Sequence, residues 1–450
     1  MDLLCKFLSM TRFFILSTLA VLFLVACGGS GGAANQGGTP IQAMAPSLTT
    51  QPTGVTVSVG SVAIFSVTAA GSTPLSYQWQ MRKDTDTTWS SAPGSAQSAS
   101  YAIQATTIKD NGYVYRVQVS NSAGTATSDA AVLTVIVPSL SVERQVNATL
   151  TDSNITAIPG TGEAPHLAIN PSASVNQRGK LLVFLPGTQG RPAQYSYILR
   201  AGAARGFHAV GLNYPNQTAM GTLCQSSADP DCYWTARNVV IFGNGTPVNG
   251  QSAVTQADSL VNRLNKLLNW LNNANPSEGW SQFLLTNQTV DWSKVVLAGH
   301  SQGGGHVGVL TKTVSLSRAI YFSSPEDWNE LSNRPASWTS MRPNVTPASM
   351  QYGFGSDSDT LVPNAHAFVH WDNLGLVKPA SGPVLVDGVS IPFSNSHQLH
   401  TSLPFNPSSS AFTLSLKNHG ISVVDTSTPV DGNGKPLFDT NGVWEYLCFQ

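Results

Sequence analysis

The chain has 450 residues and a formal net charge of -1, and only 10% of its residues are charged. This length exceeds one ordinary domain and predicts two, with enough apolar residues to bury a large core. A surface with so little charge has nothing to attract a polyanion, which argues against nucleic acid as a partner.

Residues 1–26 have the features of a signal peptide. Basic residues precede an apolar run, Phe13–Val25, that is too short to cross a bilayer comfortably, and Leu-Val-Ala-Cys closes the segment at Cys27. This ending resembles the lipobox of bacterial lipoproteins, which implies cleavage before Cys27 and lipidation of its thiol and of the new amino terminus. Cleavage by the ordinary signal peptidase is the alternative, and Met10 is an alternative start.

In a Gram-negative host, Gly28 directly after the lipidated cysteine resembles an outer-membrane sorting signal. We therefore expect an exported protein of the cell envelope, held at the membrane by its lipid anchor. Residues 27–45 show no apolar periodicity and are rich in small and polar residues, which predicts a flexible tether. A Gly-x-Ser-x-Gly pattern occurs there at Gly28, Ser30 and Gly32, but no predicted strand precedes Ser30 and no predicted helix follows it.

Residues 46–137 form short alternating runs separated by turn residues, which is typical of an antiparallel sandwich. The segment resembles a bacterial immunoglobulin-like domain. Trp79 matches the buried tryptophan of that fold, and Tyr115 precedes Val117 by two residues, as the tyrosine corner precedes the second cysteine. The cysteines themselves are absent and apolar residues take their places, so we expect this domain to depend on its core alone.

Residues 138–450 alternate strand-like and helix-like runs, which predicts a mostly parallel sheet with helices on both faces. One long run with apolar residues at three-and-four spacing predicts a helix over Ser252–Asn273. The other predicted elements are a helix over Arg191–Gly206 and strands at Lys180–Gly187, Phe207–Pro215, Lys294–Gly299, Arg318–Ser323, Ser349–Gly355 and Phe412–Leu416.

Cys224 and Cys232 are close in sequence, and in an exported protein we expect them to form a disulfide that closes a small loop. Cys448 is then left over. A bridge from Cys448 to either loop cysteine remains open at this point, because sequence does not fix connectivity.

A second Gly-x-Ser-x-Gly pattern, with Ser301 at its centre, directly follows the apolar run Val295–Ala298. Gly304–Lys312 can form a helix after it, which predicts Ser301 at a sharp strand-to-helix turn with strained backbone angles. The N–H groups at the start of that helix supply positive potential, which suits a developing oxyanion. We therefore expect Ser301 to be a nucleophile.

This strand-turn-helix context resembles the α/β-hydrolase superfamily, over about residues 180–425. The superfamily orders its triad as nucleophile, acid and base along the chain, so the resemblance implies that the acid and the base follow Ser301. The loop after the predicted strand Ser349–Gly355 aligns best with Asp359 as the acid, and Asp357 is the alternative. Acids one strand earlier, Glu326 or Asp327, are a third choice.

Five histidines follow Asp359. We expect His419 to be the base, because it directly follows the last predicted core strand, with His397 or His400 as alternatives. Among the other histidines near these motifs, the two in a segment with helical spacing are expected at the surface or in packing. The two beside the nucleophile are expected to bond the backbone, with pocket lining as the alternative. They are His366 and His370 in a segment with helical spacing, and His300 and His306 beside Ser301.

The resemblance also implies an oxyanion hole with two backbone donors. One is the N–H of Gln302, which follows the nucleophile. The loop Leu-Pro-Gly-Thr-Gln-Gly after the strand at Lys180 resembles the His-Gly-x loop of the superfamily, which makes Thr188 the second donor, with Gln189 or Gly190 as alternatives. Each such donor contributes roughly 3 kcal/mol of transition-state stabilisation.

These residues imply the chemistry of a serine hydrolase. His419 removes the proton of Ser301, Asp359 orients the imidazole, and water releases the acyl group from the acyl-enzyme intermediate. No metal or cofactor is implied, because the chain lacks His-Glu-x-x-His and Cys-x-x-Cys spacings. We expect cleavage of carboxylic esters, and a peptidase or thioesterase with the same triad is the alternative.

The segment Tyr214–Val254 lies between core strands and predicts a lid or pocket wall. Its aromatic residues Tyr233, Trp234 and Phe242 fit an apolar acyl group of the substrate, and they fit a packed cap equally well. A rival hypothesis is a surface binding protein with an inert hydrolase domain. In either case the immunoglobulin-like domain offers contact with a glycan or a cell-surface partner, or serves only as a spacer.

Overall fold

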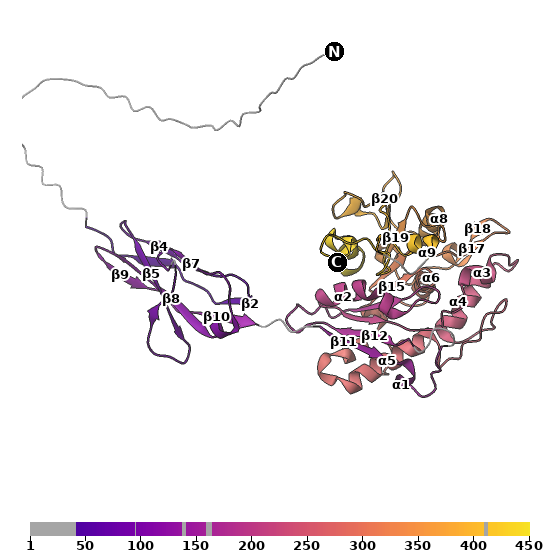
Figure 1. Cartoon of the computed structure of the whole chain (residues 1–450), viewed down its shortest axis with the longest axis horizontal. Helices are drawn as coiled ribbons and strands as arrows, with labels where there is room; N and C mark the ends of the chain where they lie inside the picture. The colour runs from indigo at the N-terminus through magenta and orange to yellow at the C-terminus, as the bar shows by residue number, and fades with distance from the viewer. Residues whose placement is uncertain (1–41, 95, 137–140, 159–163, 409–412) are drawn as a thin grey trace, which may run out of the picture. The chain divides into compact units, whose positions relative to one another are not determined.

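The computed structural model describes residues 42–94, 96–136, 141–158, 164–408 and 413–450. The predicted signal peptide, Cys27, Ser30 and most of the predicted tether lie outside these residues. The described residues form a β-sandwich and, after it in the chain, an α/β part, and each is described by itself (Figure 1). Among the described helices, none combines the length and the apolar character needed to cross a membrane.

The sandwich is built from short strands, as the turn-rich sequence predicts. Its hydrogen-bonded sheets are β1-β4, β3-β7 and the six-stranded sheet β2-β10-β8-β5-β6, in which β9 pairs with β8. The strands are β1 (Ser47–Thr50), β2 (Val55–Ser58), β3 (Ala63–Ser66), β4 (Thr68–Ala70), β5 (Ser76–Lys83), β6 (Ser90–Ser91), β7 (Ser100–Ile103), β8 (Tyr113–Asn121), β9 (Gly124–Thr127) and β10 (Ala131–Ile136).

An aromatic core stabilises the sandwich. Trp79 is fully buried, and its indole N–H donates to the carbonyl of Ser98 at 2.8 Å. The ring of Phe65 stacks on that of Tyr115, with 4.8 Å between the centroids, and Val117 is fully buried. Apolar packing therefore stands where the sequence lacks the two cysteines, which confirms the predicted core.

The α/β part contains one nine-stranded sheet in the order β11-β12-β14-β13-β15-β16-β19-β21-β20. β11 pairs antiparallel with β12, and β12 with β14, whereas the remaining pairings are parallel. The sheet is therefore mostly parallel, as predicted, with an antiparallel edge. Its strands are β11 (Val142–Val146), β12 (His166–Asn170), β13 (Leu181–Leu185), β14 (His208–Gly211), β15 (Val295–His300), β16 (Arg318–Phe322), β19 (Gln351–Ser356), β20 (Val384–Leu385) and β21 (Gln398–Thr401).

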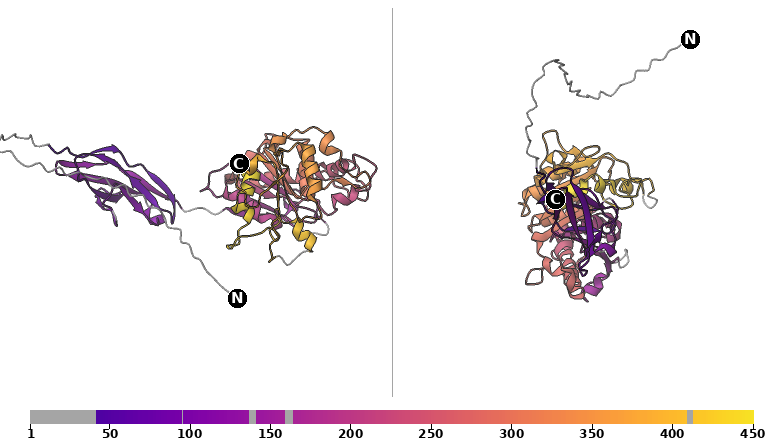
Figure 2. Two further views of the ribbon diagram at one scale, coloured as in Figure 1. Left: turned by 90° about the horizontal axis from the view of Figure 1, so that it is seen from above. Right: turned by 90° about the vertical axis from the view of Figure 1, so that its left-hand side faces the viewer.

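Helices cover both faces of this sheet (Figure 2). Successive side chains of a strand point to opposite faces, so Leu181 and Val183 join one apolar core whereas Leu182 and Phe184 join the other. The first core includes α4, α5, α6 and α8, and the second includes α2 and α10. The α-helices are α1 (Ala148–Thr151), α2 (Ser196–Ala204), α3 (Met220–Cys224), α4 (Cys232–Phe242), α5 (Leu260–Ala274), α6 (Gln302–Thr311), α7 (Trp338–Met341), α8 (Asn364–Leu374), α9 (Leu414–His419) and α10 (Leu437–Thr440).

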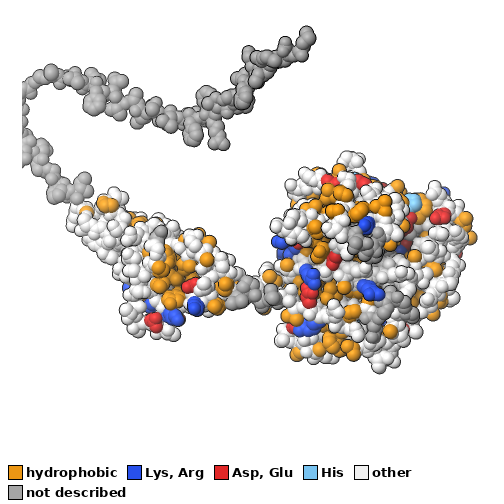
Figure 3. Space-filling view, viewed as in Figure 1, with side chains coloured by type: hydrophobic (Ala, Val, Ile, Leu, Met, Phe, Trp, Pro, Cys, Tyr) orange, Lys and Arg blue, Asp and Glu red, His pale blue; other side chains and the backbone are white. Residues whose placement is uncertain are grey.

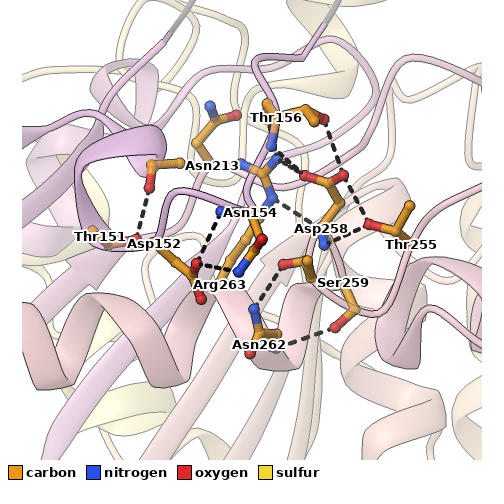
Figure 4. Close-up of polar contacts among 12 residues, drawn as sticks. Thr151, Asp152, Asn154, Thr156, Asn213, Thr255, Asp258, Ser259, Asn262 and Arg263 are labelled. Atoms are coloured by element: carbon orange, nitrogen blue, oxygen red, sulfur yellow. Dashed lines mark hydrogen bonds and ion pairs between the residues drawn. The ribbon is translucent and has the colours of Figure 1, made fainter.

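Few charged side chains appear on the face drawn in Figure 3, and some of the charges of this chain are buried in pairs instead. Arg263 on α5 donates to the carboxylate of Asp258 at 2.9 Å and to the carbonyl of Thr156 at 2.7 Å (Figure 4). Asp258 also accepts from the N–H of Thr156 at 2.8 Å. This network ties the segment before β12 to the start of α5.

The predicted helix Ser252–Asn273 is too long at its start, because α5 begins only at Leu260. Ser259 caps the helix by accepting from the N–H of Asn262 at 3.2 Å, which satisfies a donor that the first turn leaves free. Apolar spacing continues before this cap, so periodicity alone did not reveal the boundary.

The predicted strand Phe412–Leu416 is wrong, because Leu414–His419 is the helix α9. Thr413 caps this helix, and the side chain of Leu414 is 65% exposed, which a core strand would not allow. The last strand of the sheet along the chain is instead β21.

The predicted disulfide is confirmed. Cys224 at the end of α3 bonds to Cys232 at the start of α4, with 5.7 Å between their Cα atoms. Among the described residues Cys448 is the one free cysteine, and burial raises the pKa of its thiol to about 12. A thiol with so little thiolate is unreactive, so Cys448 belongs to the packing of the core.

His370 on α8 generates a prediction about pH and stability. Both of its ring nitrogens are buried without a hydrogen-bond partner among the described residues, and burial lowers the pKa of His370 to about 4. Above the unfolded pKa of about 6.5 this difference has no effect, but at lower pH only the unfolded chain takes up the proton. We expect His370 to remove about 2 kcal/mol from the free energy of unfolding between pH 7 and pH 5.

The measurement is urea unfolding of the wild type and His370→Phe at both pH values. The variant lacks the titrating group, so its stability should fall less between pH 7 and pH 5. An equal fall in both proteins would contradict the prediction.

Candidate active site

Ser301 lies at the turn between β15 and α6, near the middle of the sheet. Its backbone has φ 55° and ψ -121°, and its N–H donates to the carbonyl of Phe322 on β16 at 3.0 Å. A positive φ is a strained conformation for any residue with a side chain. The structure thus places Ser301 at the strained strand-to-helix turn that the sequence predicts.

The close approach of three chain segments at this turn requires glycine. A Cβ atom on Gly303 would lie 2.1 Å from the carbonyl oxygen of Leu185 at the end of β13. Two residues further along α6, a Cβ atom on Gly305 would lie 2.0 Å from the guanidinium of Arg237 on α4. The glycines therefore let α6 pack directly against β13 and α4.

Asp359 and His419 form a buried pair. The Nδ1 of His419 lies 2.7 Å from Oδ2 of Asp359, and both side chains are buried. The other carboxylate oxygen accepts from the N–H groups of Leu361 at 2.9 Å and Val362 at 3.0 Å. Burial raises the pKa of Asp359, but His419 and the two N–H groups outweigh it, so the pKa is below its ordinary value. An ionised Asp359 holds the proton of His419 on Nδ1 and leaves Nε2 free to accept another.

The alternative acid and the two alternative bases have other partners. Asp357 accepts from His400 at 2.8 Å and from Asn364 at 2.7 Å, which makes a separate pair. His397 stacks on Tyr352, with 3.9 Å between the ring centroids. None of the three alternatives, Asp357, His397 or His400, lines the cavity that Ser301 and His419 share.

The two earlier acids have other partners. Asp327 is fully buried between Arg237 and Trp338, and Arg237 binds both of its carboxylate oxygens. Glu326 binds His366 at 2.8 Å, and burial raises the pKa of Glu326 to about 7. His366 lies on α8 as its helical spacing predicts, yet it lines the cavity instead of only the surface.

Thr188 and Gln302 meet beside the nucleophile. The Thr188 hydroxyl donates to Oε1 of Gln302 at 2.7 Å. The N–H groups of the two alternatives are already used, because Gln189 donates to Asn216 at 3.0 Å and Gly190 donates to Gly187 at 2.9 Å. Within the described residues, no acceptor is found for the N–H of Thr188 or of Gln302. These two donors are therefore available to an oxyanion.

Ser301, His419, Gln302 and Thr188 line one cavity of about 840 Å³. Both apolar and polar side chains form its wall. The apolar ones include Met220, Leu361, Val362, Leu416 and Val424, and the polar ones include Gln194, Thr222, Gln225, Glu326, Glu330, Thr360 and Ser427. Among the described residues, no group of three or more His, Cys, Asp and Glu is arranged to hold a metal ion.

The segment Tyr214–Val254, predicted as a lid or pocket wall, forms α3 and α4. Residues in and next to α3 line the cavity, but Tyr233, Trp234 and Phe242 do not. They pack instead: Tyr233 donates to the carbonyl of Trp328 at 2.8 Å, Trp234 carries the guanidinium of Arg342 over its ring, and Phe242 packs against the core. Of the two predicted roles, these residues fit the packed cap.

Sequence analysis missed Arg237 as part of this site. Arg237 donates to the carbonyl of Gln302 at 3.0 Å while it binds Asp327, so one buried cation fixes the start of α6. The nearby His306 is fully buried and lies 3.4 Å from Arg237, so it contacts side chains and not the backbone that was expected. A lone arginine among the apolar residues of α4 was a usable signal, since buried arginines are nearly always paired.

Arg237 generates a prediction about stability. Arg237→Met leaves the buried carboxylate of Asp327 without its partner, and breaking a buried pair in this way costs about 3–5 kcal/mol. The free energy of unfolding, measured in urea, should fall by that amount, and adding Asp327→Leu should recover part of it.

The control is Arg200→Met, whose ion pair with Glu143 is largely exposed. Exposed pairs contribute about 1 kcal/mol or less, so this variant should stay close to the wild type. Equal losses in the Arg237 and Arg200 variants would show that the buried pair has no special role.

The β-sandwich is similar to known immunoglobulin domains. Residues 46–135 match the family model of the Immunoglobulin I-set domain. The solved N-terminal four immunoglobulin domains of Dscam1 isoform 4.44 are 19% identical, with 23% of this chain and 28% of that chain covered and a TM-score of 0.21. One titin domain solved at atomic resolution is 30% identical, with 22% of this chain and 99% of that chain covered and a TM-score of 0.18.

The chain thus spans 28% of the length of that Dscam1 structure. No curated protein matches this chain. The family match and the aromatic core with its buried Trp79 agree on the same segment. Residues 46–135 are therefore an immunoglobulin-like domain.

Proposed function

We propose that the α/β part is a serine hydrolase with the α/β-hydrolase fold, and that it cleaves carboxylic esters. The observation that carries this proposal is that the strained serine and a histidine paired with buried Asp359 line one cavity. Strained serines and buried Asp–His pairs are each costly, and their meeting in one cavity is typical of nucleophilic catalysis.

The order of elements supports the fold that we propose. Ser301 follows β15, which lies between β13 and β16 in the parallel part of the sheet. Asp359 follows β19, and His419 comes after β21 along the chain. The sequence order of nucleophile, acid and base is the order found in α/β-hydrolases.

We propose the mechanism of a serine hydrolase for these residues. Nε2 of His419 takes the proton of the Ser301 hydroxyl as the oxygen attacks the ester carbonyl, and ionised Asp359 stabilises the imidazolium. The N–H groups of Gln302 and Thr188 hold the negative charge that develops on the carbonyl oxygen. His419 then protonates the leaving alcohol, and a water activated by the same histidine releases the acid.

The residues that line the cavity favour an ester with an apolar acyl group and a polar remainder. Apolar side chains such as Met220, Leu361 and Leu416 offer contact to an apolar acyl group. Gln225, Glu326 and the other polar side chains offer hydrogen bonds to the rest of the substrate. We propose a short acyl chain, because a long one would have to cover the polar part of the wall.

We also propose that the enzyme is located at the cell envelope. A lipid anchor at Cys27 would hold it at the cell envelope, and the immunoglobulin-like domain would act as a spacer or contact a glycan or cell-surface partner. Globomycin, an inhibitor of lipoprotein signal peptidase, should make the precursor accumulate if Cys27 is lipidated.

A fluorophosphonate probe tests the proposed nucleophile. The wild type should be labelled, Ser301→Ala should not, and His419→Ala should react far more slowly because its serine has no base. His397→Ala is the matched control and should label like the wild type, because His397 does not line the cavity. An unlabelled wild type would favour the inert binding protein.

The acid is tested by Asp359→Asn beside Asp357→Asn, with hydrolysis of p-nitrophenyl acetate as the measurement. Losing the carboxylate that orients the base lowers kcat by about 10⁴-fold in triads of this kind, and we expect a loss of this order for Asp359→Asn. Asp357→Asn should leave kcat nearly unchanged, because Asp357 pairs with His400. The reverse pattern would move the acid to Asp357.

A further inference from the structure

His300, the residue before the nucleophile, is hydrogen-bonded at both ring nitrogens. Its Nε2 lies 3.0 Å from the backbone carbonyl oxygen of His419, and its Nδ1 lies 3.1 Å from the hydroxyl oxygen of Tyr195. The same hydroxyl accepts from the N–H of Gly187 at 3.1 Å. These bonds connect the segment that carries the base to the loop that carries Thr188.

The bonds have only one consistent direction. A carbonyl oxygen accepts only, so Nε2 of His300 carries the proton and donates to His419. In a neutral imidazole Nδ1 is then the acceptor, so the Tyr195 hydroxyl donates to it and accepts from Gly187. Any other tautomer would leave at least one buried polar group unpaired, at a cost of several-fold to a hundredfold in the folding equilibrium.

Burial fixes His300 in this neutral form. The exposed fractions of His300 and Tyr195 are 4% and 3%. The titratable groups around His300 are Tyr195, His419 and Asp359. Burial and then the charge of His419 lower the pKa of His300 to about 3. His300 therefore adds no positive charge next to His419, whose ring centroid is 4.5 Å away.

Gly187 is packed closely against His300 and Ser301. A Cβ atom on Gly187 would lie 3.0 Å from Nδ1 of His300 and 3.1 Å from Cβ of Ser301. His300 thus contacts the loop after β13 directly, and it holds His419 through a hydrogen bond. One side chain thus bonds the segment that carries the base and packs against the loop that carries Thr188.

We propose that His300 is a positioning residue, which sets the backbone of His419 relative to Ser301 and to the loop that carries Thr188. This inference rests on the proposed function. His300 does not touch the reacting atoms in this role, so its loss should lower kcat and leave KM nearly unchanged. Misplacing a catalytic group by about 1 Å costs about 100-fold in rate, which sets the expected scale.

The experiment compares His300→Leu, which removes both bonds, with His300→Gln, whose amide can still donate to the carbonyl of His419. We expect kcat for p-nitrophenyl acetate to fall about 10- to 100-fold in the leucine variant and to recover most of that loss in the glutamine variant. Tyr195→Phe should lower kcat by a smaller factor. The matched control is His397→Leu, whose histidine also bonds a backbone carbonyl but outside the cavity, and its kcat should equal that of the wild type.

A second measurement does not depend on activity. In full-length protein with ¹⁵N-labelled histidine, one imidazole should remain neutral and protonated on Nε2 from pH 5 to pH 9, and its signal should vanish in His300→Gln. An imidazole assigned to His300 that titrates near pH 6.5 would overturn the inference.

The outcomes separate the two proposals. A wild type that the fluorophosphonate does not label defeats the proposed function, and with it any role of His300 in catalysis. A labelled wild type with unchanged kcat in His300→Leu defeats only the role of His300. Equal losses in the leucine and glutamine variants also overturn the inference, because the donor to His419 would then not matter.

Discussion

The strained turn at Ser301 is the constraint on which the α/β part depends. The turn holds a serine at φ 55° at the end of a buried strand, and the chain can adopt it only because Gly303 has no side chain to strike the carbonyl of Leu185. Sheet pairing on both sides of β15 opposes any relaxation of this strain. The strands that pair with β15 therefore help to determine where the Ser301 hydroxyl lies.

A buried arginine stabilises the strand-to-helix turn at Ser301. Arg237 reaches from α4 to the carbonyl of Gln302 and to both oxygens of Asp327, so the first turn of α6 is tied to α4 and to the loop after β16. A second buried pair, Arg263 with Asp258, fastens the start of α5. These two ion pairs are buried in a chain that has few charged residues. In the interior, each guanidinium donates to several carbonyl and carboxylate oxygens at once.

The expectation that His419 is the base rested on a predicted strand directly before it. The predicted strand before it does not exist, since Thr413 caps the helix α9 there. The structure nevertheless brings His419 to Asp359, because the chain after β21 returns to the carboxyl ends of the parallel strands. The alternatives His397 and His400 contact Tyr352 and Asp357 instead, and neither lines the cavity that contains Ser301.

Sequence by itself determined the immunoglobulin-like sandwich, the mostly parallel sheet and the strand-turn-helix at Ser301, because each follows from local periodicity, turn residues and spacing. Only the tertiary structure decided that Cys224 pairs with Cys232, which acid meets which histidine, that the N–H of Thr188 has no acceptor among the described residues, and that Arg237 and His300 line the same cavity as Ser301. These are contacts between residues far apart in the chain, and sequence spacing carries no information about the distances that folding creates between them.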